Sequence, residues 1–200
     1  MKMRARLRKL ADWAVRFVAA MRTYLRIHTR GGTDYARWNN VANLHADWDS
    51  RTAGLAGLVP PGSSVLEFGA GRKTLQRYLP SGCTYTPSDL ADRGDGTIIF
   101  DLNASELPSL RKHDVAVFSG VLEYVQDVPR VVELMARTVK MVVASYAPCE
   151  SVPGVVDRRG QGWVNDYTVS QLEEIFIKQG FRIDAKGVWR DQKTWRFVRT

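Results

Sequence analysis

The sequence predicts an α/β fold, built on a sheet of seven mostly parallel strands with an antiparallel hairpin at one edge. From residue 62 onward, short apolar stretches alternate with segments of helical periodicity, which is typical of a parallel sheet covered by helices. The last two apolar stretches are joined by a turn at Arg190-Asp191, and such sheets accept an antiparallel edge strand. The 200-residue chain is long enough to bury a core. Its 44% hydrophobic and 25% charged residues are typical of a globular protein.

The chain begins with a predicted helical extension, residues 1–32, which precedes a main domain at residues 33–200. Apolar residues in the extension recur at spacings of three and four, which is the period of one helix face. Gly31 and Gly32 are a stop signal for this helix. The apolar residues of the face are Leu7, Leu10, Ala14, Phe17, Val18, Met21 and Leu25.

The elements of the main domain follow in order. Residues 34–58 are typical of one or two helices, and Val59-Pro60-Pro61-Gly62 separates them from the first strand. Residues 147–166 carry proline and glycine and predict a long loop. Strands are predicted at 64–68, 84–87, 97–100, 114–119, 139–145, 181–188 and 194–198, and helices at 72–79, 128–138 and 169–179.

The positive charge of the chain is concentrated at its beginning. Residues 1–30 hold nine Lys and Arg and a single acid, Asp12, whereas the other 170 residues hold 20 basic and 20 acidic groups. A nucleic-acid-binding domain normally carries its basic patch on the fold itself. This distribution makes nucleic acid the less favoured partner of the main domain.

Hydropathy and cysteine content indicate the environment. The longest apolar runs have about five residues, whereas a membrane span needs about 18 and a secretory signal about 7–15. Cys83 and Cys149 are too few for a disulfide framework or a four-ligand zinc site. We therefore expect a cytoplasmic protein without a metal centre.

A glycine-rich turn follows the first predicted strand, in Val65-Leu66-Glu67-Phe68-Gly69-Ala70-Gly71. Ligands of open α/β sheets bind at the carboxyl ends of the strands, and glycines let a ligand lie against bare backbone. By itself, this turn is also typical of an ordinary strand-to-helix connection.

The next three strand ends carry groups that suit a nucleoside. Asp89 lies 22 residues after Glu67, where an acid is placed to accept hydrogen bonds from ribose hydroxyls. Asp101 ends the third strand, where it can accept a hydrogen bond from the adenine amine, and Ser119 ends the fourth. Together these strand ends predict a cofactor that contains a nucleoside.

With these motifs, roughly residues 36–200 resemble the class I S-adenosylmethionine-dependent methyltransferases, which have a Rossmann-like fold. The matching segments are the turn at 67–71, Asp89, Asp101-Leu102 and residues 118–125. The resemblance implies S-adenosylmethionine as cofactor and S-adenosylhomocysteine as product. It assigns the methionine half to Glu67, Gly69 and Gly71, the ribose to Asp89, the adenine to Asp101 and Leu102, and the methyl end to Ser119.

The chain departs from the family pattern at Lys73, where a third glycine is common. A dinucleotide oxidoreductase is the rival interpretation, but its fingerprint needs a glycine at the position of Thr74. After the fourth strand, Tyr124 stands where related enzymes often carry histidine. The catalytic candidates are Glu123, Tyr124 and Asp166, with Asp127 and His45 as further candidates for a general base.

Methyl transfer to oxygen of a small-molecule or carbohydrate acceptor is the function that we predict. The loop at 162–168 is polar and aromatic and is expected to lie over the pocket, while Trp38, Trp48 and Arg51 either cover the cofactor or pack between helices. Two alternatives stay open: an RNA methyltransferase that uses the basic extension, and a non-catalytic binding or scaffold protein with this fold.

The basic amphipathic extension has three candidate partners. It can lie on an anionic membrane surface, pack on a second subunit, or pack on its own domain. Packing on a second subunit or on its own domain is the slightly favoured interpretation.

Overall fold

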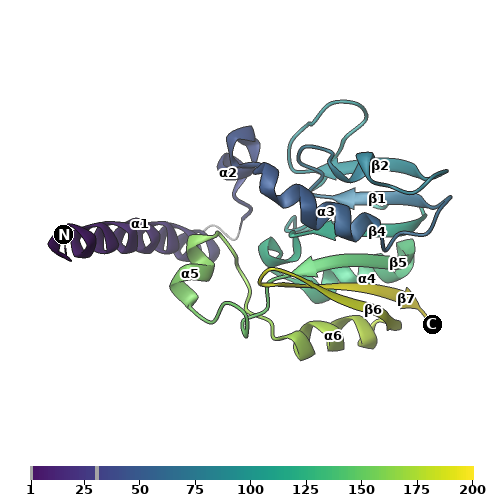
Figure 1. The fold of residues 1–200 in the computed structure, drawn as a ribbon. Coiled ribbons are helices and arrows are strands. Elements are labelled where there is room, and N and C mark those ends of the chain that lie inside the picture. Colours follow the sequence, from purple (N-terminus) through teal and green to yellow (C-terminus); the bar gives the residue numbers. More distant parts are fainter. Residues whose placement is uncertain (1, 30–31) are drawn as a thin grey trace.

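The computed structural model describes residues 2–29 and 32–200 and contains the predicted seven-stranded sheet (Figure 1). The strand order is β3-β2-β1-β4-β5-β7-β6, in which β7 runs antiparallel to both of its neighbours. The prediction of a mostly parallel sheet with an antiparallel hairpin is therefore confirmed. The strands are β1 (Ser64–Phe68), β2 (Thr84–Asp89), β3 (Ile98–Ile99), β4 (His113–Ser119), β5 (Val139–Tyr146), β6 (Phe181–Trp189) and β7 (Gln192–Arg199).

Helices cover both faces of the sheet. On one face, α4 (Val128–Thr138) and α6 (Val169–Lys178) pack on the larger apolar cluster, which includes Leu66 and Phe68. On the other face, α3 (Asp49–Ala56) packs on Val65. Successive side chains of a strand point to opposite faces, so the continuous apolar run of β1 fills both layers.

The prediction of a helix at residues 72–79 is wrong. The structure forms only a 3₁₀ turn there, Leu75–Arg77. Gly71 and Lys73 have φ of 50° and 54°, which lies in the left-handed region and cannot continue a right-handed helix. The first crossover of the sheet is therefore short, and the chain passes quickly from β1 to β2.

The predicted loop at 147–166 contains a short helix, α5 (Val155–Gly160). In Figure 1, α1 (Lys2–Thr29) extends away from the sheet and lies beside α5. Arg16 of α1 pairs with Asp157 of α5 at 3.4 Å. A Cβ added at Gly160 would lie 3.6 Å from the carbonyl oxygen of Arg16, an ordinary van der Waals distance, so the two helices are in direct contact at this point.

The apolar face predicted for the extension is not the face that packs on α5. Ala20 and Thr23 are the side chains of α1 that become buried, whereas Phe17, Val18 and Met21 are 40%, 50% and 41% exposed. Leu10 and Leu25 are exposed as well, and the side chain of Leu7 lies outside the described part. None of the helices in the described residues is long and apolar enough to cross a membrane.

Candidate active site

A cavity opens at the carboxyl ends of β1, β2 and β4. Its wall is completed by residues 32–34 after α1, by the segment from Leu44 to Thr52 that includes part of α3, and by residues 161–164 after α5. The structure places all seven predicted cofactor-binding residues on this wall: Glu67, Gly69, Gly71, Asp89, Asp101, Leu102 and Ser119.

The turn after β1 needs its first glycine. Gly69 has φ of 66°, in the region that favours glycine. A Cβ built there would lie 2.6 Å from Cγ2 of Val121, a residue of the loop after β4. The turn and this loop can therefore approach each other only because residue 69 has no side chain.

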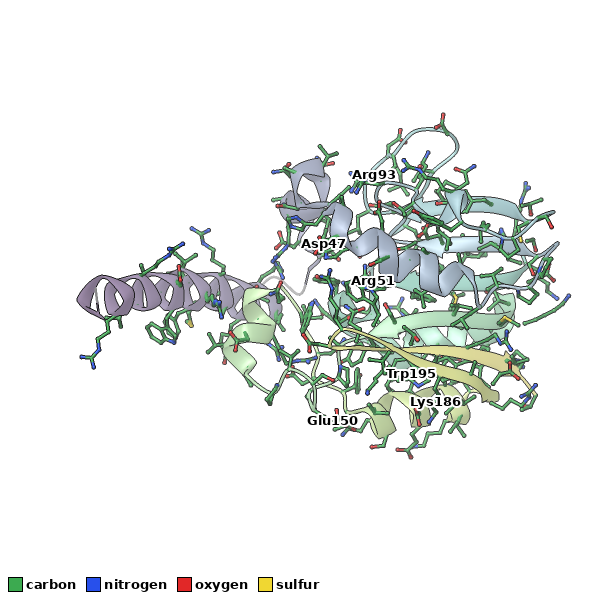
Figure 2. The ribbon with its side chains drawn as sticks, viewed as in Figure 1. Asp47, Arg51, Arg93, Glu150, Lys186 and Trp195 are labelled. Carbon is green, nitrogen blue, oxygen red and sulfur yellow. The ribbon has the colours of Figure 1, made fainter. Side chains whose placement is uncertain are left out.

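Asp89 holds the glycine turn from the end of β2. One carboxylate oxygen accepts a hydrogen bond from the backbone N–H of Gly71 at 2.8 Å. The other accepts from the N–H of Ala91 and pairs with Arg93 at 3.2 Å, and both side chains of this ion pair are nearly buried. Figure 2 shows Arg93 in the loop beyond β2. Asp89 therefore fixes the shape of the wall that it lines.

Glu67 is a buried acid on the cavity wall, with 2% of its surface exposed. The hydroxyl of Tyr85 donates a hydrogen bond to it, and in the described part of the chain no Lys or Arg forms an ion pair with it. Burial raises the pKa of Glu67 to about 8, and the negative charge of Asp89 acts in the same direction. The positive charge of Arg51 lowers the pKa of Glu67 only in part, so a cationic ligand group in this part of the cavity would stabilise the carboxylate further.

Asp101 is held by residues that follow α1. The hydroxyls of Thr33 and Tyr35 donate hydrogen bonds to its two oxygens at 2.6 and 2.7 Å, and the N–H of Asn103 donates at 2.9 Å. The hydrogen bond to Asp101 raises the pKa of Tyr35. Sequence reasoning missed Thr33 and Tyr35, because no local pattern links them to a residue 66 or more positions away.

Arg51 of α3 lies under the loop after β4 (Figure 2). It donates hydrogen bonds to the carbonyl oxygen and the hydroxyl of Ser119 at 3.0 and 3.1 Å. The rings of Trp48 and Trp189 lie 5.6 and 5.4 Å from its guanidinium carbon. Burial lowers the pKa of Arg51, but a guanidinium stays charged at neutral pH. Arg51 thus provides a fixed positive charge on the cavity wall.

Of the three catalytic candidates, only Tyr124 lines the cavity. Its ring meets that of Trp38 edge-on, with centroids 4.7 Å apart, and its hydroxyl accepts a hydrogen bond from Trp163 at 3.2 Å. Burial raises the pKa of Tyr124 to about 12, so the phenol is protonated at neutral pH.

The structure does not bring Glu123 and Asp166 to the cavity wall. Glu123 is fully buried and accepts a hydrogen bond from the N–H of Ala147, while its second oxygen accepts none from the described residues. Asp166 is paired with Arg158 at 2.7 Å and also with Arg159. Both side chains are thus engaged in contacts within the protein and do not line the cavity.

The two histidines of residues 33–200 lie at opposite ends of the sheet. His45 lines the cavity and packs edge-on against Trp48, with ring centroids 5.0 Å apart. His113 begins β4 at the opposite end of the sheet, where its ring contacts the hydroxyl of Thr86 at 3.1 Å. In the described part of the chain, no group of three or more His, Cys, Asp or Glu could hold a metal ion.

The fold and the cavity together define an α/β protein with a cavity, lined by strand-end acids and a glycine turn, at the carboxyl edge of its sheet. A family model described as a methyltransferase domain matches residues 41–186. The chain therefore belongs to the class I S-adenosylmethionine-dependent methyltransferases, with S-adenosylmethionine as cofactor. The donor set fits this cofactor, because a buried acid without an ion-pair partner among the described residues suits a cationic group, and strand-end acids suit a nucleoside.

Solved structures share the fold at low sequence identity. CalO1, a methyltransferase of calicheamicin biosynthesis solved with S-adenosylhomocysteine, is 14% identical, with 93% of this chain and 69% of that chain covered and a TM-score of 0.63. The 1,6-didemethyltoxoflavin N1-methyltransferase of Burkholderia thailandensis is 16% identical, with 92% of this chain and 89% of that chain covered and a TM-score of 0.62. Mitomycin 7-O-methyltransferase MmcR is 16% identical, with 91% of this chain and 67% of that chain covered and a TM-score of 0.64. No curated protein matches the sequence.

Proposed function

We propose that the protein transfers a methyl group to a hydroxyl of a small-molecule or carbohydrate acceptor. The observation that carries this proposal is the aromatic wall of the cavity, made by Trp38, Tyr124 and Trp163 beside the imidazole of His45. Flat aromatic side chains suit a ring-shaped acceptor, and an imidazole is the usual general base near neutral pH. Structures with small-molecule acceptors in their names, a toxoflavin precursor and mitomycin, support the class of acceptor.

The cofactor contacts follow the geometry of the wall. Glu67 pairs with the ammonium of the methionine half, and the guanidinium of Arg51 is placed to attract its carboxylate. Asp89 binds the ribose, and Asp101 with the N–H of Leu102 binds the adenine. Gly69 and Gly71 let the ligand lie against the backbone.

When bound, S-adenosylmethionine supplies a methyl group already activated on a sulfonium. The task of the protein is to align the acceptor and exclude water. Tyr124 stays protonated and holds the acceptor by a hydrogen bond, because burial raises its pKa to about 12. His45 accepts the hydroxyl proton as the oxygen attacks, since it is the imidazole on this wall.

The test is an acceptor panel of phenols, sugar alcohols, amines and a structured RNA, with release of S-adenosylhomocysteine as the readout. We expect turnover with a hydroxyl acceptor, and a kcat about 100-fold lower in His45→Asn, because general base catalysis contributes about 10²–10⁴-fold. His113→Asn is the matched control and keeps the wild-type kcat, since His113 lies away from the cavity. Turnover confined to amines or RNA, or an unchanged kcat in His45→Asn, contradicts the proposal.

The pH dependence of ligand binding tests Glu67 directly. In the free protein the pKa of Glu67 is about 8, so the carboxyl group is protonated at pH 7, whereas pairing with an ammonium requires the carboxylate. Binding therefore releases a proton, and the affinity for S-adenosylhomocysteine is expected to rise with pH, by at most about tenfold per unit, until pH 8.

Isothermal titration calorimetry at pH 6, 7 and 8, in buffers of different ionisation enthalpy, measures both the affinity and the released proton. Glu67→Gln is expected to bind S-adenosylhomocysteine more weakly, and its affinity is expected not to rise with pH. The same affinity at all three pH values in the wild-type protein is incompatible with an ammonium held by Glu67.

A further inference from the structure

The exposed face of α1 is strongly apolar. Leu10, Trp13, Phe17, Val18 and Met21 are between 40% and 62% exposed, and the rings of Trp13 and Phe17 stack at 5.2 Å. At about 100° per residue, these five side chains fall within a sector of about 140° of the helix. Large apolar side chains gathered on one exposed face usually mark a contact with a partner.

The face that α1 turns to its own chain is a different one. Ala20 and Thr23 are buried, and they lie on the side where Arg16 pairs with Asp157 of α5. On the same helical projection, this side is centred about 120° away from the apolar sector. Docking on α5 therefore fixes the helix while its apolar side chains stay exposed.

The charge of α1 indicates the chemistry of the partner. Residues 1–30 carry nine Lys and Arg against one acid, and the rest of the chain is balanced. Arg22 is exposed and falls about 40° beyond the edge of the apolar sector that lies farther from α5, and exposed Arg6 falls within the sector itself. A surface that is both apolar and anionic complements such a helix, as at the boundary between anionic headgroups and acyl chains.

Two other partners fit this face less well. A second copy of α1 would bring together two helices of the same high positive charge, which repel each other. Nucleic acid would neutralise the arginines, but it offers no apolar phase for Leu10, Phe17 and Met21. An acidic lipid surface satisfies both the charge and the apolar face.

We propose that α1 is an interfacial membrane anchor that lies along an anionic lipid surface. Its apolar face enters the acyl boundary, and the arginines beside this face contact the headgroups. This binding does not depend on the acceptor or on the methyl transfer.

The test is co-sedimentation of the full chain with vesicles of phosphatidylglycerol and phosphatidylcholine in equal amounts, and with vesicles of phosphatidylcholine alone. Phe17→Glu lies on the apolar face, and Val15→Glu lies on the arginine side, where Val15 is 70% exposed. Both substitutions replace an exposed apolar residue and change the charge equally. We expect wild-type binding to the anionic vesicles, about tenfold or more weaker binding in Phe17→Glu, and less than about threefold weaker binding in Val15→Glu.

Met21→Glu, on the same face as Phe17, is expected to repeat the loss, and circular dichroism melts should match the wild type because all three positions are exposed. Equal losses in Phe17→Glu and Val15→Glu would overturn the proposal, because charge alone would then explain binding. Binding to a structured RNA without binding to vesicles would also overturn it. A dimer seen in gel filtration and dissociated by Phe17→Glu would overturn it as well. Vesicle binding is measured without cofactor or acceptor, so its result is separate from that of the proposed activity.

Discussion

Asp89→Asn is expected to abolish the stabilisation that S-adenosyl ligands give to the protein. The carboxylate of Asp89 lies on the cavity wall, where we propose that it accepts hydrogen bonds from the ribose. Hydrogen bonds to a charged group are worth about 1.5–3 kcal/mol each, so the neutral amide should weaken binding about 100-fold. Asparagine rather than alanine is the appropriate change, because its oxygen can still accept a hydrogen bond from Arg93.

Thermal unfolding with S-adenosylmethionine, S-adenosylhomocysteine and NAD in parallel measures this effect. At about 100 times its Kd, a ligand adds about 2.7 kcal/mol of stability, which raises the Tm of a chain of this size by about 5–11 °C. We expect this shift with both S-adenosyl ligands and none with NAD. Asp95→Asn is the control, since Asp95 lies in the loop that follows β2 and its side chain is 98% exposed. A full shift in Asp89→Asn would show that the ribose is held elsewhere.

Arg158→Met is expected to produce the largest loss of stability. The Arg158 side chain is 1% exposed and donates hydrogen bonds to the carboxylate of Asp166, to the carbonyl oxygens of Ala147 and Asn165, and to the hydroxyl of Tyr146. Methionine fills part of the volume but leaves the carbonyl oxygens of Ala147 and Asn165 without this donor, whereas Asp166 keeps Arg159 and the Tyr146 hydroxyl keeps the N–H of Tyr167. Leaving those two buried acceptors unsatisfied costs about 1–3 kcal/mol each, so the Tm should fall by about 4–24 °C.

Arg159→Met is the matched control for this change. Arg159 bonds to the same carboxylate, Asp166, but its side chain is 13% exposed and keeps contact with water. We expect a loss of stability less than half that of Arg158→Met. If Asp166→Asn instead removed turnover and left the Tm unchanged, Asp166 would return as a catalytic candidate.

The sequence was sufficient to predict the sheet and to predict that the seven residues named for the cofactor lie together on one cavity wall. Both depend on local signals: apolar strands mark the core, and the residues that end parallel strands meet at one edge of the sheet. Glu67, Asp89 and Asp101 each lie at or near the carboxyl end of a strand. Their common location could therefore be predicted without knowledge of distant contacts.

The remaining features depend on contacts that no local pattern encodes. Arg51 meets Ser119 across 68 residues, and Trp189 reaches the same guanidinium from the edge hairpin. Similarly, the apolar face of α1 was correctly recognised, but packing was the favoured interpretation of it. The chain instead buries Ala20 and Thr23 against α5, because small side chains allow the two helices to come close.

The hydrogen bonds from Thr33 and Tyr35 to Asp101 have a thermodynamic consequence. They attach the segment that follows α1 directly to the carboxylate where we propose that adenine binds. A molecule that binds α1 and displaces either hydroxyl must therefore change the affinity of the cavity for its cofactor. By reciprocity, the cofactor changes the affinity of α1 for that molecule by the same factor, so the helix and the cavity form two linked binding sites.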